Sequence, residues 1–567
     1  MSGEAQPGGA GNSEVPEGWS EAQEGKAKLL QRGNDVFYNP AMAVNRDMSI
    51  AVLREFIKMR DEEIRSGALK RWKRKPLHKA QPGAGAGAEG GSAAAKDVAN
   101  DAEELPLQFK APGEPNTDVR IFEGLAATGL RSLRYALEVQ DGVEEIVAND
   151  MDPGAVEAIR QNVARNGAQA AARITPSVGS ASVVMLSNPQ QFDVVDLDPY
   201  GSPVQFLDSA VQTVTDGGLL MVTATDTAVL CGNNGETCFA KYGAYPLHRY
   251  YCHEQAVRVL LSCMEAHANR YKRRIVPLLS LYMDYYVRVF VRVYTSAKDV
   301  KDTPSDRLAY VYQSQNCDTF HLQPVGTRTV KGSSVKYSAG RGPAVPQKCD
   351  VCGSGFLFGG PIWAAPLHDK DFVTRLGKGV RAAGSSGLHL YDYVEARLTN
   401  VEEELIDVPL YIDLHHICGT LKVTPIKMDT FRSALGNAGY RVSGSHANPL
   451  AVKTDAPWGV IWDVLRQWTK EAAPDKQYDP DGVPAAILSK PIETAVSFAR
   501  HVPSLSKAKM NNVGRFLPNP DENWGPQRKH GKAKIGESAK DIERAAQAKT
   551  GKRGAGADGG GGKKQKQ

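Results

Sequence analysis

Between residues 119 and 295 the chain alternates between short runs rich in β-branched residues and stretches with the apolar spacing of amphipathic helices. The runs are VRIF, EEIVAND, ARIT, FDVVDLD and GGLLMVTAT, and a strand pair within PLLSLYMDYYVRVFVRVYT closes the series. Strands separated by helices usually pair in parallel, so the alternation predicts an α/β fold with helices on both faces of a parallel sheet. Ligands of such sheets bind outside the carboxyl ends of the strands, where functional side chains are therefore expected.

The length of 567 residues exceeds what one ordinary hydrophobic core organises and predicts two domains with flexible ends. After residue 298 the alternation weakens, and helical patterns over 430–439 and 458–468 indicate a second, α+β domain. We expect a disordered N-terminus over 1–30, a first domain over 31–298 with a Gly/Ala-rich insertion near 80–115, a C-terminal domain over 299–510 and a basic disordered tail over 511–567.

Charge is distributed unevenly along the chain. The formal net charge is +5, but residues 525–567 contain twelve Lys or Arg against four Asp or Glu, so this tail carries +8 and the remainder about −3. A second basic cluster, KRWKRKPLHK over 70–79, surrounds one tryptophan. Both suit a polyanion, because each phosphate that is neutralised releases counterions. A solvated tail that promotes solubility, and an exposed basic helix end, explain the same charges.

Dispersed cysteines and the absence of a long apolar run indicate a protein of a reducing compartment with no membrane partner. The eight cysteines are dispersed through the long chain, and no stretch approaches eighteen consecutive apolar residues. The basic clusters favour the nucleus, with the cytoplasm or the mitochondrion as alternatives, although the acidic N-terminus does not resemble a mitochondrial transit peptide. Nothing in the sequence implies an obligate protein partner.

The segment EGLAATGLRSLR follows the first strand directly and opens a helix. Its small residues let the backbone approach a ligand, and the helix N-terminus offers free N–H groups. The spacing is not GxGxxG, and the strand ends in Glu123, whose carboxylate would repel a pyrophosphate but tolerate the cationic S-adenosylmethionine. Asp150 ends the next strand, where a carboxylate can accept hydrogen bonds from both ribose hydroxyls; a strand-capping aspartate is the alternative.

The fourth strand, FDVVDLDPYGSP, ends in Asp198, Pro199 and Tyr200. This combination suits chemistry on a planar exocyclic amine, because it supplies an acceptor for the N–H, a stiff backbone and a ring that stacks on a base. We therefore predict Asp198 and Tyr200 as catalytic residues and all three as substrate-binding residues. A turn carboxylate with a core aromatic is the alternative. Asp193 and Asp196, on the same strand, are expected to support loops.

Several motifs, in order from about residue 34 to residue 500, closely resemble the tRNA guanine N2-dimethyltransferases that modify position 26. They are FYNPAMAVNRDMS, GLAATGLRSLR, VANDMDPGAV, DLDPYGSP, TATDTAVLCG, KYGAYPLHRYYCHE, VRVFVRVYT, GGPIWAAPLHD and the stretch from YIDLHHICGTLKV to DAPWGVIW. The resemblance implies a class I methyltransferase domain with a family-specific C-terminal domain. It also implies S-adenosylmethionine as the donor, tRNA as the partner, and N2-methyl- and N2,N2-dimethylguanosine as products.

The resemblance also assigns cofactor contacts. The arginine of NRD corresponds to Arg46, that of the glycine loop to Arg131, and the ribose-binding acid to Asp150. Where the family often has Asp-Ala near the adenine, this chain has Ser180 and Ala181, so a serine oxygen or a backbone carbonyl would replace the carboxylate.

Zinc is not expected, although cysteines that could bind it are present. Relatives often carry two Cys pairs in the second domain, whereas here Ser314 replaces one cysteine and leaves Cys317, Cys349 and Cys352. With His321 these three thiols would make a tetrahedral set, but a metal-free CxxC turn is the default.

Three other functions fit parts of the pattern. A nicotinamide dehydrogenase would share the sheet but lacks GxGxxG here, and an adenine N6-methyltransferase also uses an acid-Pro-aromatic site. A non-catalytic RNA-binding protein would leave Arg46, Asp150 and Asp198 without a shared purpose. Which tRNAs are used, whether one or two methyl groups are added, and the oligomeric state are not determined by the sequence.

Overall fold

The computed structural model describes residues 19–31, 39–69, 118–139 and 141–520, together with positions 15, 17, 76 and 77. The predicted Gly/Ala-rich insertion, the basic residues of the 70–79 cluster and the tail beyond residue 520 lie outside the described residues. No helix among the described residues combines the length and the apolar composition needed to span a membrane.

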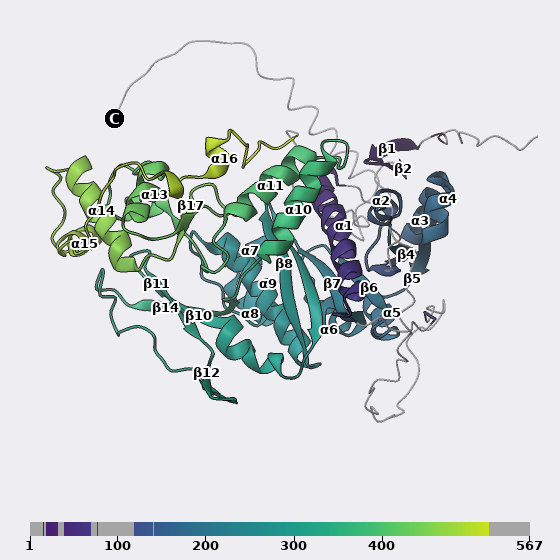
Figure 1. Ribbon diagram of the computed structural model, residues 1–567, viewed down its shortest axis with the longest axis horizontal. Helices are drawn as coiled ribbons and strands as arrows, with labels where there is room; N and C mark the ends of the chain where they lie inside the picture. The colour runs from purple at the N-terminus through teal and green to yellow at the C-terminus, as the bar shows by residue number, and fades with distance from the viewer. Residues whose placement is uncertain are drawn as a thin grey trace, which may run out of the picture. The chain divides into compact units, whose positions relative to one another are not determined.

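A seven-stranded sheet organises residues 118–295, in the order β5–β4–β3–β6–β7–β9–β8 (Figure 1). Its strands are β3 (Val119–Glu123), β4 (Val143–Asp150), β5 (Ile174–Val178), β6 (Phe192–Leu197), β7 (Val214–Ala224), β8 (Arg273–Met283) and β9 (Tyr286–Thr295). β3 to β7 pair in parallel, and β9 runs antiparallel between β7 and β8. The predicted α/β sheet is therefore confirmed, strand by strand.

Helices cover both faces of this sheet because successive side chains of each strand point to opposite sides. On β3, Ile121 belongs to the core beneath α1 and α2, whereas its neighbour Phe122 belongs to the core beneath α5, α6 and α9. The helices of this part are α1 (Ala43–Arg65), α2 (Leu130–Glu138), α3 (Pro153–Arg165), α4 (Gly167–Arg173), α5 (Ala181–Leu186), α6 (Val204–Thr213), α7 (Thr227–Leu230), α8 (Gly235–Tyr242) and α9 (Cys252–Asn269).

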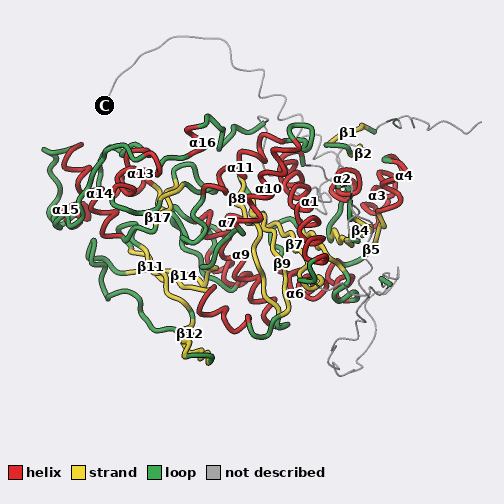
Figure 2. Tube along the Cα trace, in the orientation of Figure 1, coloured by secondary structure: helices red, strands yellow, loops and turns green. Residues whose placement is uncertain are grey.

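The C-terminal part mixes small sheets with helices, as the sequence predicted (Figure 2). One sheet has the strand order β11 (Phe320–Pro324), β10 (Leu308–Ser314), β14 (Phe356–Trp363). A hairpin pairs β12 (Gly326–Lys331) with β13 (Ser334–Ala339). In a third sheet, β17 (Ala451–Thr454) lies between β15 (Ile412–Asp413) and β16 (Val442–Ser443). The helices are α10 (Lys370–Ala383), α11 (Tyr391–Glu403), α12 (Leu414–Thr420), α13 (Met428–Asn437), α14 (Trp458–Ala472), α15 (Val483–Leu488) and α16 (Lys507–Met510).

Helices α10 and α11, which the sequence placed in the second domain, pack on α1 of the first (Figure 1). Phe372, Leu376 and Leu398 join the same hydrophobic core as α1. Arg375 adds ion pairs of 2.7 Å to both Glu55 and Glu62 on α1. The packing therefore crosses the boundary that was expected near residue 298.

Two predictions of disorder are wrong at their edges. Residues 20–31 form a hairpin, β1 (Ser20–Glu24) with β2 (Ala27–Gln31), that buries Ala27 and Leu29. The Leu30 amide of this hairpin donates a 2.9 Å hydrogen bond to Asn162 Oδ1. Residues 511–518 pack on α11, where Asn400 and Tyr393 donate hydrogen bonds to the Arg515 and Pro518 carbonyls. Neither segment shows the apolar periodicity from which order is predicted. Both segments are ordered because tertiary contacts to distant helices stabilise them.

Candidate active site

The acidic residues predicted from the strand ends lie along one edge of the sheet. Glu123 ends β3, Asp150 ends the neighbouring β4, and Asp198 follows β6, which flanks β3 on its other side. Strand order reverses between β3 and β6, since the chain proceeds outward from β3 through β4 to β5 and then returns to β6. A crevice for a ligand forms at such a switch point.

The loop from β3 to α2 is held in a tight, partly left-handed conformation. Ala127 has φ of 47° and Gly129 has φ of 75°. A side chain at Gly129 would also approach Ile159 to 3.2 Å, so this position requires glycine. The Ala127 amide donates a 2.9 Å hydrogen bond to Asp150 Oδ2, which ties the loop to the end of β4.

The end of β4 joins three loops through Asp150 and Asn149. Asp150 Oδ1 accepts a 3.0 Å hydrogen bond from the Asp152 amide, so both carboxylate oxygens have backbone donors. Asn149 Nδ2 donates to the carbonyls of Gly124 (3.1 Å) and Gly179 (3.0 Å), while its buried Oδ1 has no hydrogen-bond partner among the described residues. A strand end with an orphaned polar atom is a natural place for a polar ligand.

Beyond Asp150 the rim of the crevice is partly apolar and exposed. Met151 is 75% exposed, which is unusual for a large apolar side chain beside buried strands. Ser180 is also exposed, whereas Ala181 is buried and lies about 3.5 Å from the position a Gly124 Cβ would take. The Ser180 carbonyl accepts from the Val184 amide at 3.0 Å and is therefore already engaged in α5.

Arg131 connects the loop to α1 and to β6. Its Nη1 donates to Asn45 Oδ1 at 3.1 Å and to Ser49 Oγ at 3.2 Å, both on α1, and lies 3.5 Å from Asp196. Its Nη2 pairs with the Asp198 carboxylate. The guanidinium is 4% exposed, so several oxygens compensate its buried charge.

Glu123 faces the start of α2 rather than solvent. One carboxylate oxygen accepts a 3.0 Å hydrogen bond from the Ser132 amide, and the other lies 3.8 Å from Arg131 Nε. Burial raises the pKa of Glu123 to about 8, although the Arg131 charge acts in the opposite direction. The group can therefore change its protonation near neutral pH when a cation binds beside it.

The predicted acceptor residues lie on an exposed turn after β6. The Asp198 side chain is 21% exposed and Tyr200 is 45% exposed. Gly201, at φ of 79°, donates to Thr225 Oγ1 at 2.6 Å and accepts from the Thr225 amide at 2.9 Å, which fixes the turn to the end of β7. Burial raises the pKa of Tyr200, with a further contribution from the nearby Asp198 carboxylate.

Arg46 is buried beside the site but already has a carboxylate partner. Its Nε donates to Glu24 Oε1 at 2.6 Å and its Nη2 to the Asn39 carbonyl at 3.0 Å. Glu24 comes from the N-terminal hairpin that the sequence placed in a disordered segment. The structure therefore fixes Arg46 by an ion pair with this hairpin, a contact that the motif NRD did not indicate.

Other side chains at the site were missed by the sequence argument. Asn45 and Ser49 lie one helical turn apart, within NPAMAVNRDMS, and their spacing could have indicated a shared partner. Tyr285, in the turn between β8 and β9, accepts a 3.3 Å hydrogen bond from Asn39, and burial raises its pKa to about 12 with help from Asp198. No local pattern distinguishes Tyr285 from a core tyrosine.

Comparison with known proteins decides the family. The family model for the N2,N2-dimethylguanosine tRNA methyltransferases matches residues 18–466. This chain belongs to that family. It is 49% identical over 530 residues to tRNA (guanine(26)-N(2))-dimethyltransferase 2 of Arabidopsis thaliana, covering 90% of this chain and 88% of the relative. It is 33% identical to the mitochondrial tRNA (guanine(26)-N(2))-dimethyltransferase of Saccharomyces cerevisiae, covering 89% of this chain and 91% of that protein.

A solved structure supports the class I methyltransferase fold. Trm1 from Pyrococcus horikoshii, solved with S-adenosyl-L-methionine, is 28% identical and superposes with a TM-score of 0.58, covering 78% of this chain and 98% of that one. The predicted fold class and family resemblance are thus confirmed.

The three cysteines that the sequence offered as possible metal ligands lie close together in the structure. The ligand atoms of Cys317, Cys349 and Cys352 lie within 4.8 Å of one another. The Cys317 and Cys349 sulfur atoms are 3.8 Å apart, close to the separation of about 3.8 Å expected for two thiolates on one tetrahedral zinc. The fourth side is formed by Ser314 Oγ, 3.2 Å from the Cys352 sulfur, and His321 is not part of the cluster. Three vertices fit zinc, and a hydroxyl is a poor fourth ligand.

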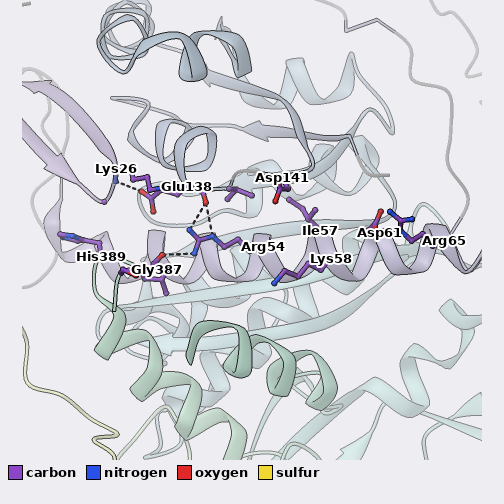
Figure 3. Close-up of a pocket in the computed structure, with 14 residues that line it drawn as sticks. Lys26, Arg54, Ile57, Lys58, Asp61, Arg65, Glu138, Asp141, Gly387 and His389 are labelled. Carbon is purple, nitrogen blue, oxygen red and sulfur yellow. Dashed lines mark hydrogen bonds and ion pairs between the residues drawn. The ribbon is translucent and has the colours of Figure 1, made fainter. Parts of the chain in front are cut away.

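A cavity of about 860 Å³ lies along α1 (Figure 3), and none of the predicted site residues lines it. Arg54 crosses it and donates to the carbonyls of Glu138 (2.9 Å) and Gly387 (3.0 Å). Its wall includes Val139 and Asp141, just before β4, so the cavity lies at the amino ends of the strands. Ligands of such sheets bind outside the carboxyl ends of the strands, so the reaction is not expected in this cavity.

Proposed function

We propose that this chain transfers methyl groups from S-adenosylmethionine to the exocyclic N2 of guanine 26 in tRNA, giving N2-methyl- and then N2,N2-dimethylguanosine. The observation that carries the proposal is the pairing of Asp198 with Arg131 beside the exposed Tyr200, at the carboxyl edge of the sheet. Membership of the family supplies the reaction class and the donor. The roles of individual residues, described next, are part of the proposal.

The donor would lie across the ends of β3 and β4. Asp150 is positioned to accept hydrogen bonds from the ribose hydroxyls, while Met151 and Ala181 would cover the adenine ring and Ser180 would meet its edge. The exposure of Met151 supports this placement, because a bound purine would cover it.

The charged end of the donor would lie toward α2. Glu123 would pair with the amino group of the donor. Arg131 and Arg46 would pair with its carboxylate while each keeps its present carboxylate partner. S-adenosylmethionine supplies an electrophilic methyl group on its sulfonium. The protein's contribution is to hold that group in line with the acceptor nitrogen.

The acceptor guanine would stack on Tyr200 and present its amine to Asp198. The amine lone pair is delocalised into the purine, so it reacts only when it is oriented and when positive charge on N2 is offset. Asp198 would accept the N2–H hydrogen bond, offset the positive charge that develops on N2, and take the proton released as the new N–C bond forms and the donor's S–CH3 bond breaks to leave S-adenosylhomocysteine. Arg131 would hold the Asp198 carboxylate in position. Guanine 26 must leave its stack to reach this site, and the tRNA contacts offset that cost.

The decisive experiment incubates the protein with unmodified tRNA and donor and identifies the methylated nucleosides by mass spectrometry. N2-methyl- and N2,N2-dimethylguanosine are expected, and a tRNA with adenosine at position 26 should yield neither. N6-methyladenosine as the product would favour an adenine methyltransferase, and donor-independent tRNA binding without any product would favour an RNA-binding role.

Nuclear localisation remains a proposal and rests on the basic clusters at 70–79 and 525–567. The relative from Saccharomyces cerevisiae is named as mitochondrial, so family membership does not decide the compartment. A fluorescent fusion of the full chain, compared with one whose Lys70, Arg71, Lys73 and Arg74 are replaced by Gln, tests it. Loss of nuclear signal in the variant is expected, and unchanged distribution would reject the cluster as an import signal.

A further inference from the structure

Aromatic side chains gather on the outer face of the β10–β14 sheet, in the C-terminal part of the chain. Phe358 on β14 is 51% exposed. Its ring centroid lies 4.8 Å from that of Tyr310, with the planes inclined by 29°, and 5.0 Å from that of Tyr312. The alternate residues of β10, Ala309 and Val311, are buried in the core. The three rings therefore form a platform on the side of the sheet that faces away from the core.

A series of contacts through α8 links this platform to the catalytic turn. The Tyr245 backbone pairs with Gly360 on β14, at 3.0 and 2.8 Å, and the Tyr245 ring, 49% exposed, lies against Gly235 at the start of α8. At the other end of α8, Tyr242 donates a 2.6 Å hydrogen bond to Asp226. Asp226 follows Thr225, which holds Gly201 of the catalytic turn. The platform and the catalytic turn are therefore linked through α8.

Basic residues border the same platform. From Thr319 to Cys349 the chain contains five Lys or Arg and no Asp or Glu. Ala344 donates a 2.9 Å hydrogen bond to Gln323, the register partner of Tyr310, so the segment after the β12–β13 hairpin runs beside the rings. Arg341 and Lys348, at the two ends of this segment, are exposed, as are Lys331 and Lys336 on the hairpin. Among the described residues, only Arg328 of the five has an ion pair, with Asp302.

We propose that this aromatic–basic face, defined by Tyr245, Tyr310, Tyr312, Phe358, Arg341 and Lys348, binds the tRNA nucleotides around the target guanine. The inference rests on the proposed function and extends it to the surface that holds the substrate. Exposed rings stack on unpaired bases without regard to sequence, and the bordering cations neutralise the backbone phosphates. The catalytic turn alone exposes one ring, which cannot supply the binding energy needed to draw a guanine out of a folded tRNA.

An RNA suits this face better than a protein. Protein interfaces are depleted in lysine at their centre, and a segment of thirty-one residues with five basic and no acidic side chains matches a polyanion instead.

The test compares ring and charge variants of the full chain in tRNA binding. Phe358→Ala combined with Tyr245→Ala should weaken tRNA affinity at least tenfold and lower kcat/KM for tRNA by a similar factor, while the donor Kd stays within about twofold. Phe358→Leu, which keeps apolar bulk without a ring, should behave like Phe358→Ala, whereas Phe358→Tyr should retain affinity. Tyr271→Ala, which removes an exposed ring on another element, is the matched control and should leave tRNA binding unchanged.

Charge variants report a separate signature. Arg341→Gln combined with Lys348→Gln should reduce the slope of log Kd against log salt by roughly 0.7 to 0.9 per charge removed, whereas Lys378→Gln with Lys470→Gln should not. Phe358→Ala should leave that slope unchanged. Thermal melting of each variant verifies that it is folded.

Wild-type protein that methylates tRNA, together with Phe358 and Tyr245 variants that bind tRNA normally, would overturn the inference and leave the proposed function intact. Failure of the wild type to methylate any tRNA would instead reject the proposed function. Crosslinking of bound tRNA to the peptide that contains Phe358 would support the inference even if the double variant folds poorly.

Discussion

The Arg131 guanidinium, at the start of α2, forms an ion pair with the Asp198 carboxylate at the end of β6. This contact joins the loop expected to hold the donor to the turn expected to hold the acceptor. Because Arg131 also bonds Asn45 and Ser49, α1 positions the pair from a third direction. A change at Arg131 should therefore affect both donor binding and methyl transfer, whereas a change at Asp198 should affect mainly methyl transfer.

Asp198→Asn should reduce single-turnover methylation by about 10²-fold or more, with a donor Kd within a few fold of wild type. The amide keeps the size of the side chain but removes the charge that offsets positive charge on N2. Asp208→Asn, a surface carboxylate on α6, is the control and should methylate normally. Near-normal methylation by folded Asp198→Asn would remove this residue from the mechanism.

Asp150→Ala should weaken donor binding by about 1 to 3 kcal/mol, because ribose hydroxyls and the Ala127 amide would lose their acceptor. Isothermal calorimetry measures the donor Kd, and tRNA affinity should be unchanged. Asp150→Asn, which retains one acceptor oxygen, is expected to lose less. An unaltered donor Kd in folded Asp150→Ala would contradict the ribose-binding role.

Glu123 should make donor binding depend on pH. Its pKa of about 8 leaves the carboxyl largely protonated at pH 6.5, and a bound cationic amino group favours the ionised form. Donor affinity should therefore rise between pH 6.5 and 8.5 with release of a proton, which calorimetry in buffers of different ionisation enthalpy detects. Glu123→Gln should show a flatter profile. A wild-type profile identical to that of the variant would reject the contact.

The raised pKa of Glu123 also makes the free energy of unfolding depend on pH. Because the folded-state pKa is raised above the ordinary glutamate value of 4.5, the Glu123 contribution is fully present below pH 4.5 and is lost as pH rises through about 8. Glu123→Gln, which cannot ionise, should thus gain stability relative to wild type over this interval in urea unfolding.

Glu24→Gln should destabilise the protein by about 3 kcal/mol, since it leaves the buried Arg46 and Arg134 guanidinium groups undercompensated. Burial alone would raise the pKa of Glu24, but these two arginines lower it to about 2. Its contribution is therefore present above pH 4.5 and is lost as pH falls toward 2. Urea unfolding measures the change.

Glu21→Gln is the matched control on the same strand, because the Glu21 side chain is 30% exposed and pairs with Arg165 at the surface. It should cost less than about 1 kcal/mol. Equal losses in the two variants would show that Glu24 is no more important than a surface carboxylate.

Ser314→Cys should create a four-thiol zinc site from the three sulfurs that already converge. After dialysis against a chelator, zinc measured by mass spectrometry should follow the order Ser314→Cys, wild type, Cys349→Ser. Methylation should be similar in all three. Wild-type protein that retains one zinc per chain as firmly as Ser314→Cys would show that the serine is an adequate ligand.

The sequence was sufficient to predict the strands of the first domain and the acidic residues at their carboxyl ends. The alternation of periods identified the strands from β3 to β9, and Glu123, Asp150 and Asp198 were found because a parallel sheet brings its carboxyl ends to one edge. Arg131 was assigned by resemblance to a motif, without the partners that surround it. These features depend on local patterns and on a rule that holds for every sheet of this type.

Contacts between segments distant in sequence were decided only by the tertiary structure. Glu24 lies in a polar, glycine-rich stretch that has no periodicity, yet it is buried because Arg46 and Arg134 meet it there. Tyr285 and Asn149 likewise have no local signature, and their roles follow from which loops adjoin them. The aromatic platform of Phe358, Tyr310 and Tyr312 forms where two strands more than forty residues apart pair. Periodicity reports which face of an element is buried, whereas ion pairs and ring stacks require the register between elements, which long-range packing sets.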